Sequence, residues 1–123
     1  MKPDARVPLV VMLAVFVMNN LGLSQQKKEV TLLGEIVDVI SFVSSGAVKG
    51  TEEVRKSALS GNPLGFYDTG RKKLYLVGVP EMNKAANEKL LPYIGLRVFV
   101  IGKVYTRNGV DLILISDIGK SIK

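Results

Sequence analysis

The clearest hydrophobic pattern lies in residues 28–43, where apolar side chains recur at alternate positions. From Val30 to Phe42 the even-numbered positions are mostly apolar, whereas Glu35 and Ser41 fall on odd positions. A period of two is typical of a β-strand with one buried face. Gly34 interrupts the run, and a glycine inside a strand indicates a bulge or a sharp bend. We therefore predict one long, bent strand over this stretch.

Residues 44–63 break the alternation, because they are small, polar and rich in glycine. Thr51 precedes two glutamates, and acidic side chains are favourable at the positive N-terminal end of a helix. This pattern predicts a short helix from Thr51 to Ala58, with Thr51 as its cap. The Gly-Asn-Pro sequence at 61–63 ends it.

A β-hairpin is predicted next, with strands at 64–67 and 74–79. Its turn spans 68–72, where Gly70 is available for a positive φ angle. Pro80 ends the second strand, because proline cannot donate a backbone hydrogen bond to a sheet.

Residues 81–95 form the second helical interval, and Asn83 or Asn87 is the expected N-cap. Pro92 keeps this helix short. Helical spacing places three apolar residues on one buried side: Leu90, Leu91 and Ile94.

The last two predicted strands span 96–106 and 110–118 and are joined by Asn108-Gly109. This dipeptide is the strongest hairpin signal in the chain and predicts a type I′ turn. The first of these strands turns three valines to one side: Val98, Val100 and Val104.

The resulting order is three strands, a short helix and two further strands. This is the order of an OB-fold, a five-stranded Greek-key barrel, with the helix between strands three and four closing one end. We therefore predict an all-β fold in which residues 25–123 form a single domain. A β-sandwich requires about seven strands and fits less well.

The N-terminus has the three-part pattern of a secretory signal peptide. Lys2 and Arg6 precede uncharged apolar residues at 7–18, and small residues follow up to Ser24. We predict a signal peptide over 1–24, and the alternative is a retained N-terminal anchor. Either reading places the folded domain in the periplasm or elsewhere outside the cytoplasm, and cleavage would leave it without membrane contact.

Composition excludes several kinds of chemistry. The chain of 123 residues has no Cys and no His. It therefore lacks thiol nucleophiles, disulfides, Cys/His metal sites and the Ser-His-Asp triad. We predict no cofactor, no metal site and no enzymatic activity. The formal net charge of +6 is compatible with an anionic partner, but it does not distinguish nucleic acid from an acidic protein.

Three stretches, "GEIVDVISF", "NPLGFYDTGRKKLYLV" and "ANEKLLPYIGLRVFVIGKVYTRNGVDLILISDI", together resemble a family of small exported bacterial OB-fold proteins whose function is poorly known. The resemblance covers nearly all of residues 30–118 and implies the OB-fold and export. The family's usual pattern has Cys in the first-strand segment, and His and Cys in the helix that follows. Here Ser41 stands near the first position and the helix segment has neither residue, so the resemblance implies no metal or redox role.

The strand at 96–106 and the residue after it carry the main candidate site. Basic, aromatic and apolar residues share one side of the backbone: Arg97, Phe99, Ile101, Lys103, Tyr105 and Arg107. Further candidates flank the earlier hairpin turn: Tyr67, Arg71, Lys72, Lys73 and Tyr75. Aromatic platforms in a basic groove are typical of single-stranded nucleic acid binding. An apolar stripe with a charged rim is equally typical of a protein interface. The simplest alternative is packing, in which arginine and lysine stems cover apolar side chains.

Catalysis has weak support. Glu35 and Asp38 are three positions apart on a strand and so face opposite sides, unless Gly34 bends the chain. We therefore expect a non-enzymatic, exported binding module that is an accessory or assembly partner of a larger extracytoplasmic protein. The alternatives are an oligonucleotide or polyanion binder and a small-ligand-binding envelope stress module. The oligomeric state is left open.

Overall fold

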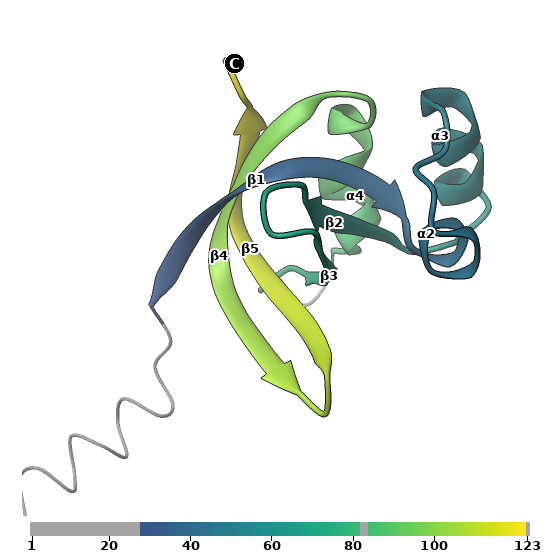
Figure 1. The fold of residues 1–123 in the computed structure, drawn as a ribbon. Helices are drawn as coiled ribbons and strands as arrows, with labels where there is room; N and C mark the ends of the chain where they lie inside the picture. The colour runs from purple at the N-terminus through teal and green to yellow at the C-terminus, as the bar shows by residue number, and fades with distance from the viewer. Residues whose placement is uncertain (1–27, 82–83, 123) are drawn as a thin grey trace, which may run out of the picture.

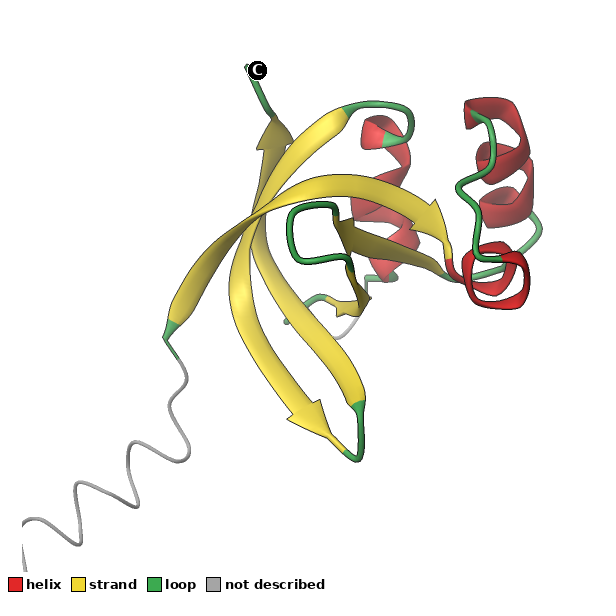
Figure 2. Cartoon of the chain, viewed as in Figure 1, coloured by secondary structure: helices red, strands yellow, loops and turns green. Residues whose placement is uncertain are grey.

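In the computed structural model, which describes residues 28–81 and 84–122, β-strands are the main secondary structure (Figure 2). The strands are β1 (Glu29–Asp38), β2 (Leu64–Asp68), β3 (Lys73–Gly78), β4 (Arg97–Arg107) and β5 (Val110–Lys120). Three short helices, α2 (Val39–Ser45), α3 (Thr51–Leu59) and α4 (Ala86–Leu90), and the 3₁₀ turn η1 (Leu91–Tyr93) accompany them. The predicted five strands and the helical segment between β3 and β4 are confirmed. The predicted signal peptide over 1–24 lies outside the described residues.

Hydrogen bonding joins the strands in the order β1-β2-β3-β5-β4, and β4 pairs again with β1, so the sheet closes on itself (Figure 1). All neighbouring strands are antiparallel except β3 and β5, which are parallel. Within the described ranges, no helix is long and apolar enough to cross a membrane.

Strand β1 serves two neighbours, and Gly34 lies where it changes from one to the other. Residues 29–35 pair with β4, whereas residues 34–38 pair with β2. A Cβ atom on Gly34 would collide with the carbonyl oxygen of Tyr67. The position therefore requires glycine because two backbones approach closely there. The pairing register of β1 runs without interruption through Gly34, so the predicted bulge is absent from this strand.

The core fills the inside of the closed sheet. Its largest fully buried side chains include Phe66, Val98, Val100, Ile113 and Ile115. Val54 and Ala58 of α3, together with Leu90 and Ile94, complete this cluster. Burial of these apolar side chains is the main source of stability in a domain without disulfides.

The prediction that the first strand continues to residue 43 is wrong, because the chain turns into α2 at Val39. Asp38 caps this helix: its carboxylate accepts hydrogen bonds from the backbone N–H of Ile40 and the hydroxyl of Ser41. Gly46 ends the helix in the left-handed conformation, with φ of 75°. These two local caps outweigh the β-branched composition of the segment.

The predicted caps of the other helices also need correction. Helix α3 begins at Thr51 as expected, but its N-cap is Gly50 and no side chain caps it. Asn87 lies inside α4 rather than at its cap, and Asn83 lies outside the described residues. The Asn87 amide instead accepts from the Leu64 N–H and donates to the Asn62 carbonyl, which fastens α4 to the start of β2.

The two hairpin turns differ in how well they were predicted. In the β2–β3 turn the positive φ angle belongs to Lys72, at 55°, and not to Gly70. In the β4–β5 turn Asn108 and Gly109 both have positive φ angles, 53° and 81°. A type I′ turn requires this pair of angles, so the second prediction is confirmed.

Candidate functional site

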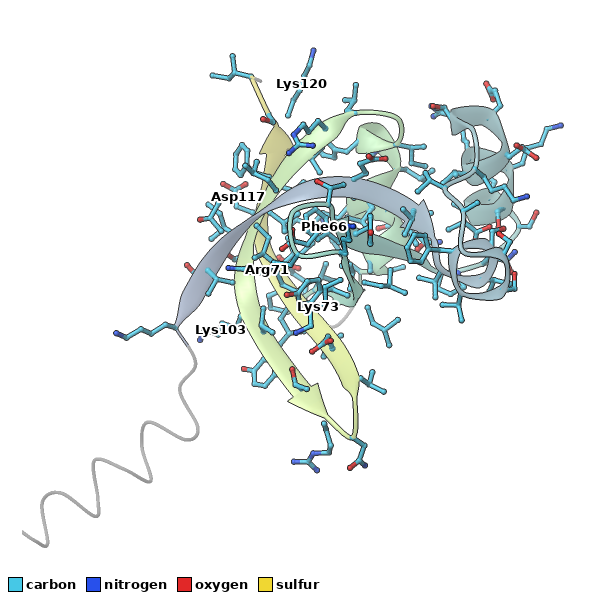
Figure 3. The ribbon with its side chains drawn as sticks, viewed as in Figure 1. Phe66, Arg71, Lys73, Lys103, Asp117 and Lys120 are labelled. Carbon is cyan, nitrogen blue, oxygen red and sulfur yellow. The ribbon has the colours of Figure 1, made fainter. Side chains whose placement is uncertain are left out.

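The six residues of the predicted stripe lie on the outer face of β4. Val98 and Val100 alternate with them and are fully buried, whereas the stripe residues are exposed or half-buried. Figure 3 labels Phe66 inside the closed sheet, and Lys103 and Asp117 on its outside. The first part of the stripe lies beside β1, whereas the last part lies beside residues 110–114 of β5. The stripe is therefore divided into two surfaces.

The first surface, the β1–β4 patch, consists of Thr31, Leu33, Phe99 and Ile101. Leu33 lies directly opposite Phe99 and Thr31 directly opposite Ile101. Leu33 is 46% exposed, which is high for a leucine in the middle of a strand. The ring of Phe99 covers Gly119 on β5, so this ring is only partly available to a partner.

Charged residues of opposite sign bound the β1–β4 patch at both ends. Glu35 lies opposite Arg97 at one end, and Glu29 lies opposite Lys103 at the other. The Glu29 carboxylate accepts a hydrogen bond of 2.8 Å from the Ser116 hydroxyl. The Arg97 guanidinium donates to the Thr69 hydroxyl at 3.4 Å. The patch therefore has an apolar centre and a rim of mixed charge.

The second surface, the hairpin surface, lies on the outer faces of β4, β5 and β3 and consists of Lys103, Tyr105, Arg107, Val110, Leu112, Leu114 and Leu76. Tyr105 lies opposite Leu112, which in turn lies beside Leu76 of β3. Leu76 is 39% exposed, and Val110 near the turn is 52% exposed. The neighbouring rows add Lys103 beside Leu114, and Arg107 beside Val110. Figure 2 shows that this β4–β5 hairpin projects away from the helices.

The candidates near the β2–β3 turn do not form one surface. Tyr75 is only 4% exposed, and its ring lies 6.4 Å from that of Phe66, so it belongs to the core. The Lys73 ammonium lies 5.9 Å from the Tyr75 ring centroid and 3.7 Å from the Asp111 carboxylate. The Lys72 side chain is exposed at the turn.

Arg71 is held to its own turn. Its guanidinium lies 3.4 Å from the buried carboxylate of Asp68, which also accepts hydrogen bonds from the backbone N–H groups of Gly70 and Arg71. Asp68 thus orders the turn and offsets part of its positive charge.

Tyr67 lies partly beneath helix α2. Its ring centroid is 4.7 Å from that of Phe42, and Val39 of the same helix packs against Gly65. The first turns of α2 therefore cover the outer face of β2. Tyr67 is consequently not an open platform on which a base could stack.

Two pockets lie beside the β1–β4 patch. One, of about 380 Å³, lies between α3 and the end of β1, and Glu35, Lys49, Thr51 and Arg97 are among its lining residues. The other, of about 300 Å³, lies beside the β2–β3 turn and is lined by Arg71, Arg97 and Leu33, among others. Arg97 contributes to both pockets.

Asp38 is a structural anchor beneath this region. Burial raises the pKa of its carboxyl, but hydrogen bonds from Ser57, Ser41 and the backbone at Ile40 outweigh this effect and bring the pKa below its usual value. These bonds join the end of β1 to α2 and α3. Among the residues at 28–81 and 84–122, no group of three or more carboxylates is placed to hold a metal ion.

The residues that the sequence interpretation missed are Leu33, Leu76, Leu112 and Leu114. A signal for two of them was present, because a two-residue turn at Asn108-Gly109 sets Tyr105 opposite Leu112 and Lys103 opposite Leu114. The parallel pairing that brings Leu76 alongside has no such local signal.

Comparison of this chain with protein-family models, with curated protein sequences and with solved structures finds no match.

Proposed function

We propose that this chain is a non-enzymatic, exported binding module of the OB-fold type, and an accessory or assembly partner of a larger extracytoplasmic protein. The OB-fold is supported by the closed strand order β1-β2-β3-β5-β4 and by the helix between β3 and β4. We include in this proposal that the chain is related to the family of small exported OB-fold proteins. The lack of Cys and His removes the side chains on which that family's redox or metal chemistry would depend.

Export is supported by the basic start, the apolar residues at 7–18 and the small residues up to Ser24. The test is the mass of the protein recovered from the extracytoplasmic fraction. Removal of residues 1–24 would yield a chain that begins at Gln25. Recovery only with the cytoplasmic fraction would contradict export, and an uncleaved mass in the membrane fraction would instead indicate the retained anchor.

Protein binding is carried by one observation, the apolar row Tyr105–Leu112–Leu76, which crosses the β4–β5 hairpin and the neighbouring strand β3. Aromatic and large aliphatic side chains with arginine at the edge are enriched at protein interfaces. Arg107 and Lys103 lie in the neighbouring rows, one on each side of Tyr105 along β4. We expect the partner to offer an apolar surface with acidic residues at its edge.

The test is capture of the partner from its own envelope and exported fraction with the tagged protein, followed by mass spectrometry. We expect one large protein in a near-fixed ratio, and its loss with Leu112→Glu. The matched control is Val43→Glu, because Val43 is a 68% exposed aliphatic residue on α2, away from the hairpin. Equal capture by both variants, or no capture by the unmodified protein, would contradict this proposal.

A polyanion ligand is the second candidate, favoured by the pocket that Arg71 and Arg97 both line. The carboxylates of Asp68 and Glu35 near these arginines, and the covering of Tyr67 by α2, argue against it. Binding of labelled oligonucleotides should fall steeply with salt if this candidate is correct. A flat salt response would exclude it.

A small ligand in the pocket of about 380 Å³ is the remaining alternative, and it corresponds to an envelope stress module. Saturable binding that is lost with Lys49→Ala and retained with Leu112→Glu would favour it over a protein partner.

A further inference from the structure

The outer residues of β1 and β4 follow matching sequences of charge and hydrophobicity. Along β1 the order is Glu29, Thr31, Leu33 and Glu35. At the same four levels, β4 has Lys103, Ile101, Phe99 and Arg97. An acidic residue at each end of one strand therefore lies beside a basic residue at each end of the other, with uncharged residues between them.

This arrangement is complementary to a copy of itself. Consider a two-fold axis that runs parallel to the strands, between β1 and β4, in the plane of contact. It places β1 of one copy over β4 of the other at unchanged levels. Glu35 then meets Arg97, Leu33 meets Phe99, and Glu29 meets Lys103.

The perpendicular two-fold axis in this plane is unfavourable. An axis that runs across the strands would reverse the levels, so that Arg97 of one copy would face Lys103 of the other. The carboxylates of Glu29 and Glu35 would face one another in the same way. Like charges placed opposite each other across an interface strongly oppose association, so charge selects the axis parallel to the strands.

We propose that the β1–β4 patch, with Glu29, Glu35, Arg97 and Lys103 at its ends, is the interface of a symmetric dimer of this chain. A second copy of this chain is the occupant whose charges match those at both ends of the patch. Closed two-fold dimers use the same surface on both subunits, so that surface must be complementary to itself, as the β1–β4 patch is. The 46% exposed Leu33 lies at the centre and becomes buried against Phe99 of the other copy.

This inference goes beyond the proposed function, because it concerns a different surface. The hairpin surface lies further along β4, on the side of β5 and β3. Lys103 borders both surfaces and is engaged in the dimer, but dimerisation through β1 and β4 leaves the row Tyr105–Leu112–Leu76 open. A larger partner would therefore meet two such rows on one dimer.

The same residues are cross-strand neighbours within one chain, so the experiment must separate the two kinds of contact. Glu35→Arg and Arg97→Glu are prepared separately in the protein recovered from cells, and mass in solution is measured by sedimentation over a range of concentrations. We expect the unmodified protein to be a dimer. Each variant alone should dimerise at least about 100-fold more weakly, because like charges then meet across the axis.

The decisive measurement is an equal mixture of the two variants. One chain then presents two carboxylates at this end of the patch, and the other presents two guanidinium groups. The mixture should form one-to-one heterodimers with an affinity close to that of the unmodified protein. Contacts within one chain cannot produce this rescue, because each variant keeps its own like-charged pair after mixing.

Several results would overturn the proposal. These are an unmodified protein that stays monomeric at high concentration, variants that dimerise normally when alone, and a mixture that shows no rescue. Thermal unfolding checks that each variant is folded. If one of them is unfolded, the pair Glu29→Lys and Lys103→Glu repeats the test at the other end of the patch. Val43→Glu should dimerise normally. Leu112→Glu should also dimerise while losing the larger partner, so failure of the dimer and failure of the proposed function remain distinguishable.

Discussion

The two sides of strand β4 differ in almost every respect except their backbone. On the inner side Val98 and Val100 are fully buried in the core cluster. On the outer side Phe99 and Ile101 are half-buried, and the charged side chains of Arg97 and Lys103 lie on either side of them along the strand. Consecutive residues of one strand therefore face two environments, because side chains alternate between the faces of a sheet.

This difference separates stability from binding. An inner residue has apolar neighbours on all sides, so its replacement by a polar group changes the free energy of unfolding. An outer residue has few neighbours within its own chain, so its replacement leaves the fold largely unchanged and alters what can dock there. Four substitutions test this division between stability and binding.

Val100→Asp should unfold the domain. A buried, unpaired carboxylate costs several kcal/mol, against a total stability of about 5 to 15 kcal/mol for a domain of this kind. Circular dichroism and thermal unfolding measure the loss directly. Normal cooperative unfolding of this variant would mean that the inner and outer faces of β4 have been exchanged.

Asp38→Ala should lower stability by about 2 kcal/mol, because a helix cap and several hydrogen bonds are lost together. Since the pKa of Asp38 is lowered in the folded state, its carboxylate stabilises the fold above the unfolded-state pKa of about 3.9. This stabilisation is lost as the pH falls through the lower, folded-state pKa. Denaturant unfolding should therefore show that the difference in free energy of unfolding between unmodified protein and variant is smaller near pH 2 than at pH 7. A difference that does not change with pH would contradict the stabilising role of the Asp38 carboxylate. Glu81→Ala, at an exposed loop position, is the control.

Phe99→Ser is the intermediate case, because the Phe99 ring covers Gly119 although it lies on the outer face. Loss of this partial burial should cost about 1 kcal/mol. It should also weaken dimer formation, because Phe99 meets Leu33 of the other copy. Thermal unfolding and sedimentation of the same samples compare the two effects. A cost as large as that of Val100→Asp would show that Phe99 belongs to the core.

Leu112 is half-buried on the outer face of β5, so Leu112→Glu should have the smallest effect on stability, below about 1 kcal/mol. It should nevertheless abolish capture of the larger partner, because a carboxylate then interrupts the apolar row of the hairpin surface. Thermal unfolding and partner capture, measured beside Val43→Glu, check both statements. Strong destabilisation would assign Leu112 a packing role within its own chain.

Local signals explain which parts of this molecule could be predicted. Alternation in β4 placed Val98 and Val100 inside and the stripe outside, and Asn108-Gly109 set the turn that aligns β5. Helix α2 was missed because its β-branched residues resemble a strand, and only the cap at Asp38 and the left-handed Gly46 distinguish it. Tyr75 was taken for a surface candidate because the sequence does not show which face of β3 points inward.

Two properties could be predicted from the sequence alone: the number of strands, and the common face of Arg97, Phe99, Ile101, Lys103, Tyr105 and Arg107. These properties depend on neighbours within a few residues, whose periodicity and turn chemistry can be recognised locally. Which strands lie beside which residues of that face is known only from the folded chain. Glu35 reaches Arg97, and Leu76 reaches Leu112, through pairings between segments that are distant in the chain. Such pairings depend on closure of the whole sheet around one core, and that is why the division of the stripe into two surfaces became visible only in the folded chain.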